Sequence, residues 1–169
     1  MNANITRILV PTDFSATADA ALDYAKGLAT KLGACLHVLH VLEDAYVGGS
    51  FAGELYVPES PNLRAMMVKE AEDLLGHRVS PQDRELLKAE TAVVVGRSFK
   101  AIVDYAQEHR ADLIVIGTHG RTGMAHLLLG SVAERIVRTA PCPVLTVRDT
   151  PVEVGAAVRV GMIPDAIIV

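Results

Sequence analysis

The sequence is poor in tryptophan, cysteine and long apolar runs. Among its 169 residues there is no Trp, and Phe and Tyr number only three and four. The two cysteines, Cys35 and Cys142, each stand alone in an apolar stretch, which excludes a paired zinc or redox motif and predicts buried thiols. No apolar run approaches the roughly 18 residues of a membrane span, and no basic and apolar leader opens the chain. We therefore expect a soluble, cytoplasmic protein.

An excess of positive charge is also missing. Lys and Arg number 16 against 20 Asp and Glu, a formal net charge of -4. Such a chain has no overall positive field to draw it to nucleic acid or to anionic lipid. Its hydrophobic half is almost entirely aliphatic, which is typical of helices packed on a buried sheet. The length favours one domain.

Strand and helix patterns alternate along the chain. Ser15 is a candidate cap for the first helix, and Gly33 a candidate stop. The pattern predicts strands over residues 5–10, 34–42, 89–95, 113–116 and 144–147, with helices over 15–33, 63–79, 98–109 and 131–139. This alternation predicts an α/β fold with a doubly wound, five-stranded, mainly parallel sheet and helices on both faces. In such a sheet, ligands bind beyond the carboxyl ends of the strands, where the strand order reverses.

Two segments do not follow the alternation. Residues 44–62 form a long insertion on the ligand side that contains Tyr46, Phe51 and Tyr56. These aromatic residues could cover a ligand, form a partner surface or belong to a simple connector. The second segment follows residue 148, so we divide the chain into a domain over 1–148 and a dimer-associated C-terminal extension over 149–169. Residues 158–160 and 166–169 of this extension could be short strands that cross a dimer interface, or the extension could pack on its own subunit.

Glycines gather after the fourth predicted strand. Gly117 and Gly120 are followed by Gly130 and Ser131 at the start of the next helix. Glycines let backbone N–H groups approach an anion, and a helix N-terminus attracts negative charge, so this pattern predicts a phosphate site. The Ser131 hydroxyl could either cap its own helix or donate to a phosphate oxygen. The Lys of a Walker A loop and the Gly-x-Gly-x-x-Gly fingerprint are both missing, which argues against ordinary P-loop enzymes and dinucleotide dehydrogenases.

Four sequence blocks together resemble the ATP-binding branch of the universal stress protein family. They are Ile8-Leu9-Val10-Pro11-Thr12-Asp13-Phe14-Ser15, Ala111-Asp112-Leu113-Ile114-Val115-Ile116-Gly117-Thr118-His119-Gly120-Arg121, Leu129-Gly130-Ser131-Val132-Ala133 and Pro141-Cys142-Pro143-Val144-Leu145. The resemblance extends over nearly all of residues 4–148. It implies a fold like that of the adenine nucleotide alpha hydrolases.

The resemblance also implies a site and a role. The cofactor would be ATP, AMP or ADP, and Mg²⁺ or Mn²⁺ could accompany its phosphates. Pro11, Thr12 and Asp13 would lie beside the base and ribose, Val41 would offer main-chain groups to adenine, and the phosphates and ribose would be held by Gly117, Gly120, Gly130 and Ser131, with His119, Arg121 and Val132 also in the site. A homodimer through the fifth strand, residues 143–148, is implied as well. The protein would act as a stress-response regulator or sensor on an unknown partner.

Several residues have plainer interpretations. Asp13 could simply cap the first helix, and His37 and His40, on opposite faces of the second strand, are expected to be structural. No catalytic residue can be assigned, because neither a Ser/His/Asp set nor a carboxylate pair stands out. We therefore expect at most weak ATPase activity. The alternatives left open are a slow ATPase or self-phosphorylating enzyme, and a chaperone-like protein with a structural nucleotide.

Overall fold

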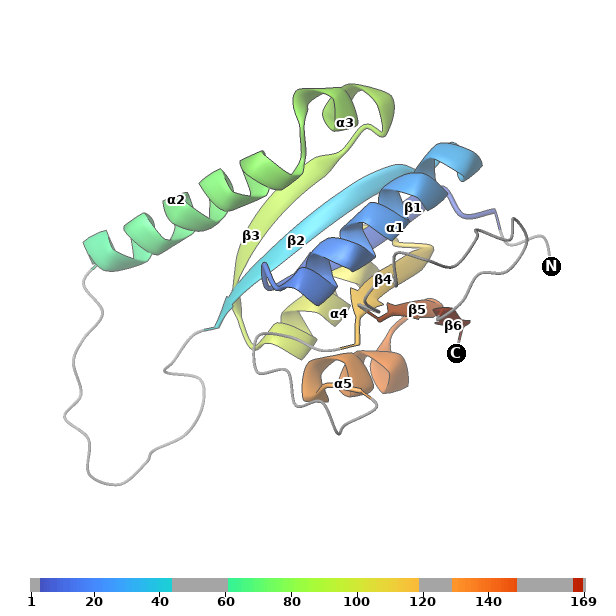
Figure 1. Cartoon of the computed structure of the whole chain (residues 1–169). Helices are drawn as coiled ribbons and strands as arrows, with labels where there is room; N and C mark the ends of the chain where they lie inside the picture. The colour runs from blue at the N-terminus through green and yellow to red at the C-terminus, as the bar shows by residue number, and fades with distance from the viewer. Residues whose placement is uncertain (1–3, 44–60, 119–128, 149–165, 169) are drawn as a thin grey trace, which may run out of the picture.

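The strands form one sheet with helices on both faces (Figure 1). The computed structural model describes residues 4–43, 61–118, 129–148 and 166–168. Its elements are β1 (Arg7–Thr12), α1 (Ala16–Leu32), β2 (Cys35–Glu43), α2 (Pro61–Arg78), α3 (Pro81–Leu86), β3 (Glu90–Gly96), α4 (Ser98–Glu108), β4 (Leu113–Gly117), α5 (Ser131–Thr139), β5 (Val144–Val147) and β6 (Ala166–Ile168). The strand order is β3-β2-β1-β4-β5-β6, and the first five strands are parallel. The predicted fold is confirmed.

Helix α1 begins and ends where the sequence predicts. The Ser15 side chain accepts a hydrogen bond from the Ala18 N–H at 3.2 Å, and Gly33 ends the helix in the left-handed conformation with φ 66°. The side of α1 that faces the sheet is built mainly from buried alanines. These small side chains let the helix backbone lie close to the strands.

Two apolar cores lie on opposite sides of the sheet. Ile8 and Val10 of β1 point into one core with α1 and α2, whereas Leu9 points into the other with α4 and α5. Alternate residues of a strand point to opposite faces, so a strand covered on both sides must be apolar throughout. This explains why the strands are nearly continuous apolar runs in the sequence.

Helix α3 was not predicted. The sequence pattern predicts no helix between residues 79 and 89, but the Ser80-Pro81 pair starts a short one there. Ser80 and Asp83 form a capping box, in which each side chain accepts a hydrogen bond from the other residue's backbone N–H. Proline suits the first helical position because its missing N–H has no helical partner there. The Ser80-Pro81 pair therefore marks a capped helix start.

Strand β6 pairs antiparallel with the outer edge of β5. The register places Ile168 opposite Leu145, Ile167 opposite Thr146 and Ala166 opposite Val147. Of the two alternatives for the C-terminal extension, the structure thus shows residues 166–168 on their own subunit. Residues 149–165 and the insertion over 44–60, with Tyr46, Phe51 and Tyr56, lie outside the described residues.

A polar network closes the amino end of the sheet. The Asp112 carboxylate, just before β4, accepts hydrogen bonds from the N–H groups of Thr6 and Arg7 at 2.9 and 3.0 Å, and from the Thr6 hydroxyl at 2.8 Å. Burial alone would raise the pKa of Asp112, but these hydrogen bonds outweigh it and hold the pKa below its ordinary value. Arg7 Nη1 also donates to the carbonyl of His109. The chain segments before β1 and β4 are thereby tied together.

His37 lies next to this network on β2. It is only 6% exposed, and its Nδ1 lies 3.2 Å from the Tyr105 hydroxyl. Tyr105 in turn stacks on the His109 ring with the centroids 3.7 Å apart. Burial lowers the pKa of His37, and the nearby Glu90 carboxylate only partly opposes this shift. These contacts agree with the expectation that His37 is structural.

Both cysteine thiols are free. The prediction that they are buried is wrong, because both residues are half-buried. Cys35 Sγ lies 3.2 Å from the carbonyl oxygen of Thr6. Burial, followed by the Asp112 carboxylate, raises the pKa of the Cys142 thiol, which favours the protonated and unreactive form. Within the described ranges, no helix is long and apolar enough to cross a membrane.

Candidate functional site

A cavity lies where the parallel strands end, at the point where the strand order reverses between β1 and β4. Its volume is about 560 Å³, within the usual range for small-molecule sites. Eight of the eleven predicted site residues line it: Pro11, Thr12, Asp13, Val41, Gly117, Gly130, Ser131 and Val132. The other three, His119, Gly120 and Arg121, lie outside the described residues.

A sharp turn after β1 brings Asp13 to the cavity. Phe14 adopts φ 66°, a left-handed conformation that is uncommon for a residue with a large side chain. Side chains hold the turn, because Thr12 Oγ1 accepts from the Phe14 N–H at 3.0 Å and Asp13 Oδ1 accepts from the Ser15 N–H at 3.1 Å. Ser15, and not Asp13, caps α1. The interpretation of Asp13 as the helix cap is therefore wrong.

The side chains of His40 and Arg78 pack on Phe14 in this turn. The His40 ring lies on the Phe14 ring with centroids 4.3 Å apart, and the Arg78 guanidinium lies 4.8 Å from the centroid of the Phe14 ring. Arg78 is fixed by Asp19 at 2.6 Å, and His40 Nδ1 is 2.8 Å from the Thr12 carbonyl oxygen. His40 thus has structural partners, as expected. It also lines the cavity, which sequence reasoning missed although His40 directly precedes Val41.

Gly117 is required by packing. A Cβ at this position would lie 2.9 Å from the carbonyl oxygen and the Cγ2 atom of Thr17, both in the first turn of α1. The Thr17 backbone is held within α1, so it cannot move away from an added methyl group as a flexible side chain could. The glycine predicted to approach a ligand therefore also lets α1 approach the end of β4.

Hydrogen bonds bring the two ends of the glycine-rich segment together. The Gly130 N–H donates to the Thr118 carbonyl at 2.7 Å, and the Thr118 N–H donates to the Val147 carbonyl at 2.8 Å. Residues 117–118 and 130–131, separated in sequence, therefore meet at one wall of the cavity.

The N-terminus of α5 faces the cavity without a side-chain cap. Gly130 occupies the N-cap position, and no side-chain hydrogen bond to the first turn occurs there within the described part of the chain. Ser131 is the first helical residue, so the prediction that it could cap its own helix is wrong. The first N–H groups of a helix and its dipole favour an anion. This end of the cavity can therefore receive a negatively charged group.

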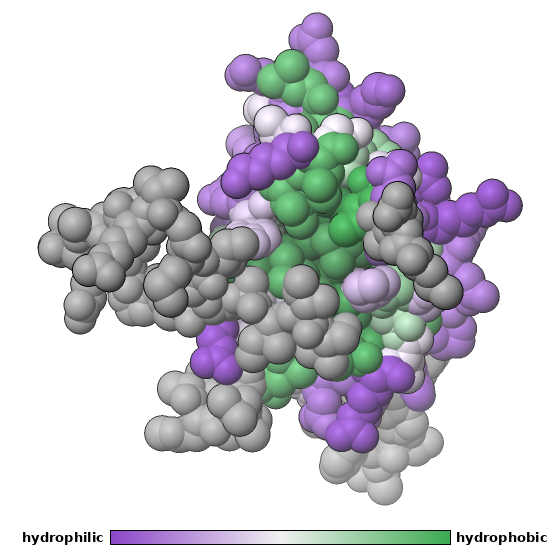
Figure 2. Space-filling view, turned by 90° about the vertical axis from the view of Figure 1, so that its right-hand side faces the viewer, coloured by the Kyte–Doolittle hydropathy of each residue, from purple (hydrophilic) through white to green (hydrophobic). Residues whose placement is uncertain are grey.

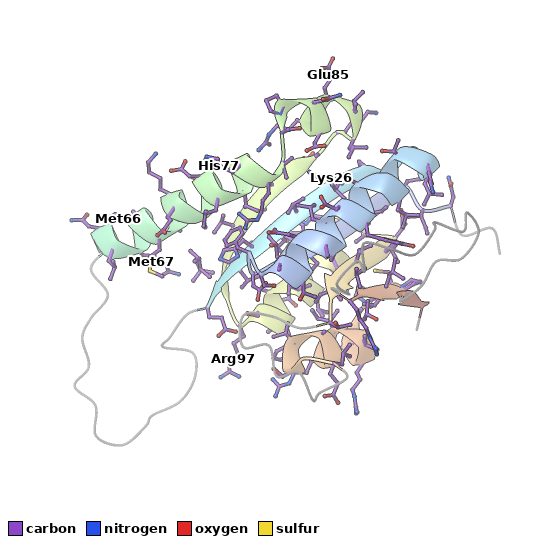
Figure 3. The ribbon with its side chains drawn as sticks, viewed as in Figure 1. Lys26, Met66, Met67, His77, Glu85 and Arg97 are labelled. Atoms are coloured by element: carbon purple, nitrogen blue, oxygen red, sulfur yellow. The ribbon has the colours of Figure 1, made fainter. Side chains whose placement is uncertain are left out.

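Sequence reasoning also missed Glu43 and Ser98. Glu43 ends β2 and Ser98 begins α4, and the Ser98 hydroxyl donates to Glu43 Oε1 at 2.6 Å beside the cavity. Figure 3 shows Met67 and Arg97 on this same side of the molecule, on α2 and at the start of α4. Because all the parallel strands end at this edge, the predicted strand ends alone could have singled out Glu43.

Comparisons with known proteins agree with this architecture. The model of the universal stress protein family matches residues 4–148. A universal stress protein of Methanocaldococcus jannaschii is 32% identical over 143 residues, which cover 84% of this chain and 81% of that protein. The universal stress protein YxiE of Bacillus subtilis is 34% identical over 145 residues, covering 84% of this chain and 98% of its own length.

Solved structures give the same picture. The universal stress protein UspA from Lactobacillus plantarum superposes with a TM-score of 0.73 at 30% identity, covering 87% of this chain and 100% of that one. A universal stress protein from Archaeoglobus fulgidus, solved in complex with dAMP, gives a TM-score of 0.58 at 26% identity over 83% of this chain and 96% of its own. A further universal stress protein, solved in complex with cAMP, gives a TM-score of 0.52 at 26% identity over 82% of this chain and 93% of its own.

Proposed function

The chain belongs to the universal stress protein family, and from this premise we propose that it binds an adenine nucleotide in the cavity at the carboxyl ends of β1, β2 and β4 and acts as a regulatory module in the stress response. The main support is the convergence of eight predicted site residues on one cavity beside an uncapped helix N-terminus. Two solved relatives hold adenine nucleotides, one dAMP and the other cAMP.

The cavity walls suggest how the nucleotide lies. Leu39, Ile102 and Ile116 give one part of the lining an apolar surface suited to a base. Asp13 supplies a carboxylate that can accept hydrogen bonds from ribose hydroxyls. The phosphates would then lie at Gly130 and Ser131, where the N-terminus of α5 stabilises negative charge.

A divalent cation would be held mainly through the nucleotide. The described residues contain no group of three or more His, Cys, Asp or Glu side chains that could hold a metal ion. Mg²⁺ commonly uses phosphate oxygens and water with few protein ligands, so the residues present are compatible with it. Glu43, Ser98 and Ser131 supply side-chain oxygens to the lining at the α5 end of the cavity.

The binding proposal is tested by identifying the nucleotide. The purified full-length protein is denatured, released nucleotides are separated by chromatography, and AMP, ADP and ATP are titrated into nucleotide-free protein by calorimetry. Asp13→Asn should weaken binding by roughly tenfold, the scale of one hydrogen bond to a charged group. The matched variant Asp23→Asn, on the exposed side of α1, should bind as the wild type does. Failure of the wild type to bind any of the three nucleotides would refute the proposal.

A regulator and a slow ATPase differ in phosphate release. We expect the samples that bind ATP to release little phosphate, at a rate that does not depend on Asp13. Phosphate release that persists through purification and is lost in Asp13→Asn would instead support the enzyme.

The cytoplasmic location stays a prediction.

We further propose that the segment 143–148, which contains β5, pairs with a second copy of the chain. The antiparallel pairing of β6 demonstrates that this edge accepts a strand. Figure 2 shows apolar residues gathered, among polar ones, on the face that is the right-hand side of Figure 1. An edge accepts one neighbour at a time, so the partner's β5 would displace β6.

Sedimentation equilibrium of the full chain and of Ile167→Pro tests this arrangement. Proline cannot donate the hydrogen bond of the strand ladder, so Ile167→Pro should release β6 and strengthen dimerisation. A monomer mass for both proteins at micromolar concentration would contradict the homodimer.

A further inference from the structure

A second, smaller cavity of about 260 Å³ adjoins the first. The two share Glu43, Ser98, Ser131 and Val132 in their linings. The smaller cavity adds the side chains of Arg97, Phe99 and Arg135. It therefore continues the main cavity past the N-terminus of α5, the end at which the phosphates are proposed to lie.

The two cavities differ in charge. The described lining of the main cavity contains the carboxylates Asp13 and Glu43 and no Lys or Arg. The smaller cavity contains two guanidinium groups, Arg97 and Arg135, against the single carboxylate of Glu43. In a chain whose formal net charge is -4, two arginines in one small cavity are a local exception. An anionic group that extends from Ser131 would enter a positive region.

Helix geometry places Arg135 about one turn after Ser131 along α5. The two residues are four positions apart, so they share one face of α5 about 6 Å apart along the axis. Long side chains on a helix lean towards its N-terminus, which directs Arg135 back towards Ser131. The Arg135 guanidinium lies 5.0 Å from the centroid of the Phe99 ring. This contact places the exposed Arg135 side chain over the Phe99 ring, where a cation is attracted to the ring face.

Arg97 sits at the start of the neighbouring helix. It occupies the N-cap position of α4, and in the described chain its side chain makes no capping hydrogen bond to the first turn. The smaller cavity thus meets the uncapped starts of two helices, α4 and α5. By contrast, Ser15 caps α1 and Ser80 caps α3 with their side chains, away from this cavity. The helix dipoles of α4 and α5 add to the positive charge of the arginines.

We propose that Arg97 and Arg135 form a subsite for the terminal phosphates of a nucleoside polyphosphate. The inference rests on the proposed function and adds a ligand preference to it: the chain binds adenosine triphosphate and diphosphate more tightly than the monophosphate. A guanidinium is a planar fork of donors that matches phosphate oxygens in pairs. Glu43, held by the Ser98 hydroxyl, balances the arginines and opposes the ligand, but the two positive charges outweigh its one negative charge.

Calorimetric titration of AMP, ADP and ATP into the full chain tests the subsite. Arg97→Gln and Arg135→Gln should each weaken ATP binding by roughly tenfold, the scale of a lost charge-assisted hydrogen bond, and leave AMP binding unchanged. Unchanged AMP binding also demonstrates that each variant is folded. The matched control is Arg138→Gln, on the same helix, whose side chain is 73% exposed and pairs with Glu134. This control should bind all three nucleotides as the wild type does.

Each result separates the subsite from the proposed function. An ATP to AMP affinity ratio that is the same in both variants and in the wild type would overturn the subsite and leave nucleotide binding intact. Inorganic tripolyphosphate that binds as tightly as ATP would count against the proposed function and not against the subsite, because the adenosine part would then add nothing to the affinity. Absence of binding by all three nucleotides to the wild type would instead defeat the proposed function itself.

Discussion

The two ends of the sheet use the same kinds of residues in opposite ways. At the amino end, Asp112 and Arg7 join neighbouring segments of the chain, and polar side chains find partners within the protein. At the carboxyl end, two helices begin without side-chain caps, as far as the described residues extend, beside cavities that contain Glu43, Arg97 and Arg135. At this end the N-termini of α4 and α5 face a cavity.

The residues at the two ends of the sheet therefore have different roles. Those at the amino end stabilise the fold, and those at the carboxyl end are available to bind a ligand. Satisfied hydrogen bonds stabilise the fold, while donors held in place without an internal partner are available to a ligand. Neither end leaves a buried polar side chain unsatisfied, since among the described residues no buried side-chain nitrogen or oxygen lacks a hydrogen bond. We therefore expect changes at the amino end to alter stability alone. Changes at the carboxyl end should alter ligand affinity, with one exception.

That exception is Gly117, where the largest effect is expected. Gly117→Ala places a methyl group against the Thr17 backbone of α1, so it should destabilise the fold by about 1–3 kcal/mol and weaken nucleotide binding as well. Urea denaturation and calorimetry measure the two effects. The control is Gly27→Ala within α1, where an added Cβ meets open space and should stabilise by about 0.5–1 kcal/mol. Equal stability of Gly117→Ala and the wild type would show that α1 does not need the glycine.

The next effect tests the amino end. Asp112→Ala removes the acceptor of three hydrogen bonds and should cost about 1 kcal/mol of unfolding free energy, with nucleotide affinity unchanged. Asp104→Ala, which breaks an exposed ion pair with Lys100, should change stability by less than about 0.5 kcal/mol. A change in nucleotide affinity in Asp112→Ala would break the separation between the two ends.

The Asp112 contribution should also depend on pH. Its pKa is lower in the folded protein than in the unfolded chain, so the unfolded chain takes up the proton first on acidification. The stability that Asp112 adds is complete above its unfolded pKa of about 3.9 and is lost as the pH falls through the folded value. Urea denaturation should therefore show the gap between wild type and Asp112→Ala closing below that pH. A gap that stays constant would contradict this origin.

A smaller effect concerns His37. Burial lowers its pKa from the ordinary value of 6.5, so below this pH the unfolded chain binds a proton that the folded protein does not. The wild type should lose stability between pH 7.5 and pH 5.5, and His37→Gln should lose less. Tyr105→Phe keeps the ring that buries His37 and should retain the wild-type slope, as urea denaturation at the two pH values can show. Equal slopes for His37→Gln and the wild type would argue against this contribution.

The smallest effect is expected at Glu43. Glu43→Gln keeps an acceptor for the Ser98 hydroxyl but removes the negative charge beside the proposed phosphate path. ATP affinity should rise by up to about fivefold, the range of a surface charge contact. Glu90→Gln, the same change at the amino end, should leave calorimetric ATP affinity unaltered. Weaker ATP binding by Glu43→Gln would indicate that the carboxylate helps to hold a cation.

Local patterns predicted most of the fold. Ser15 and Gly33 mark the ends of α1 because a cap and a left-handed stop depend only on neighbouring residues. The strand bounds came out within one or two residues, since burial on both faces requires an uninterrupted apolar run. Helix α3 was missed because a Ser-Pro pair can either break a helix or begin one. Only the Asp83 side chain, reaching back to Ser80, distinguishes the two cases.

For the site, the sequence by itself determined which residues stand at the strand ends and at the start of α5, because alternation of strands and helices places all those ends at one edge. Only the tertiary structure decided what meets across that edge. The closeness of Thr17 to Gly117, the stack of Arg78, Phe14 and His40, the pairing of β6 with β5 and the shared cavity of Arg97 and Arg135 all join residues from different elements. Such contacts depend on how helices and strands pack in space, and spacing along one chain does not encode them.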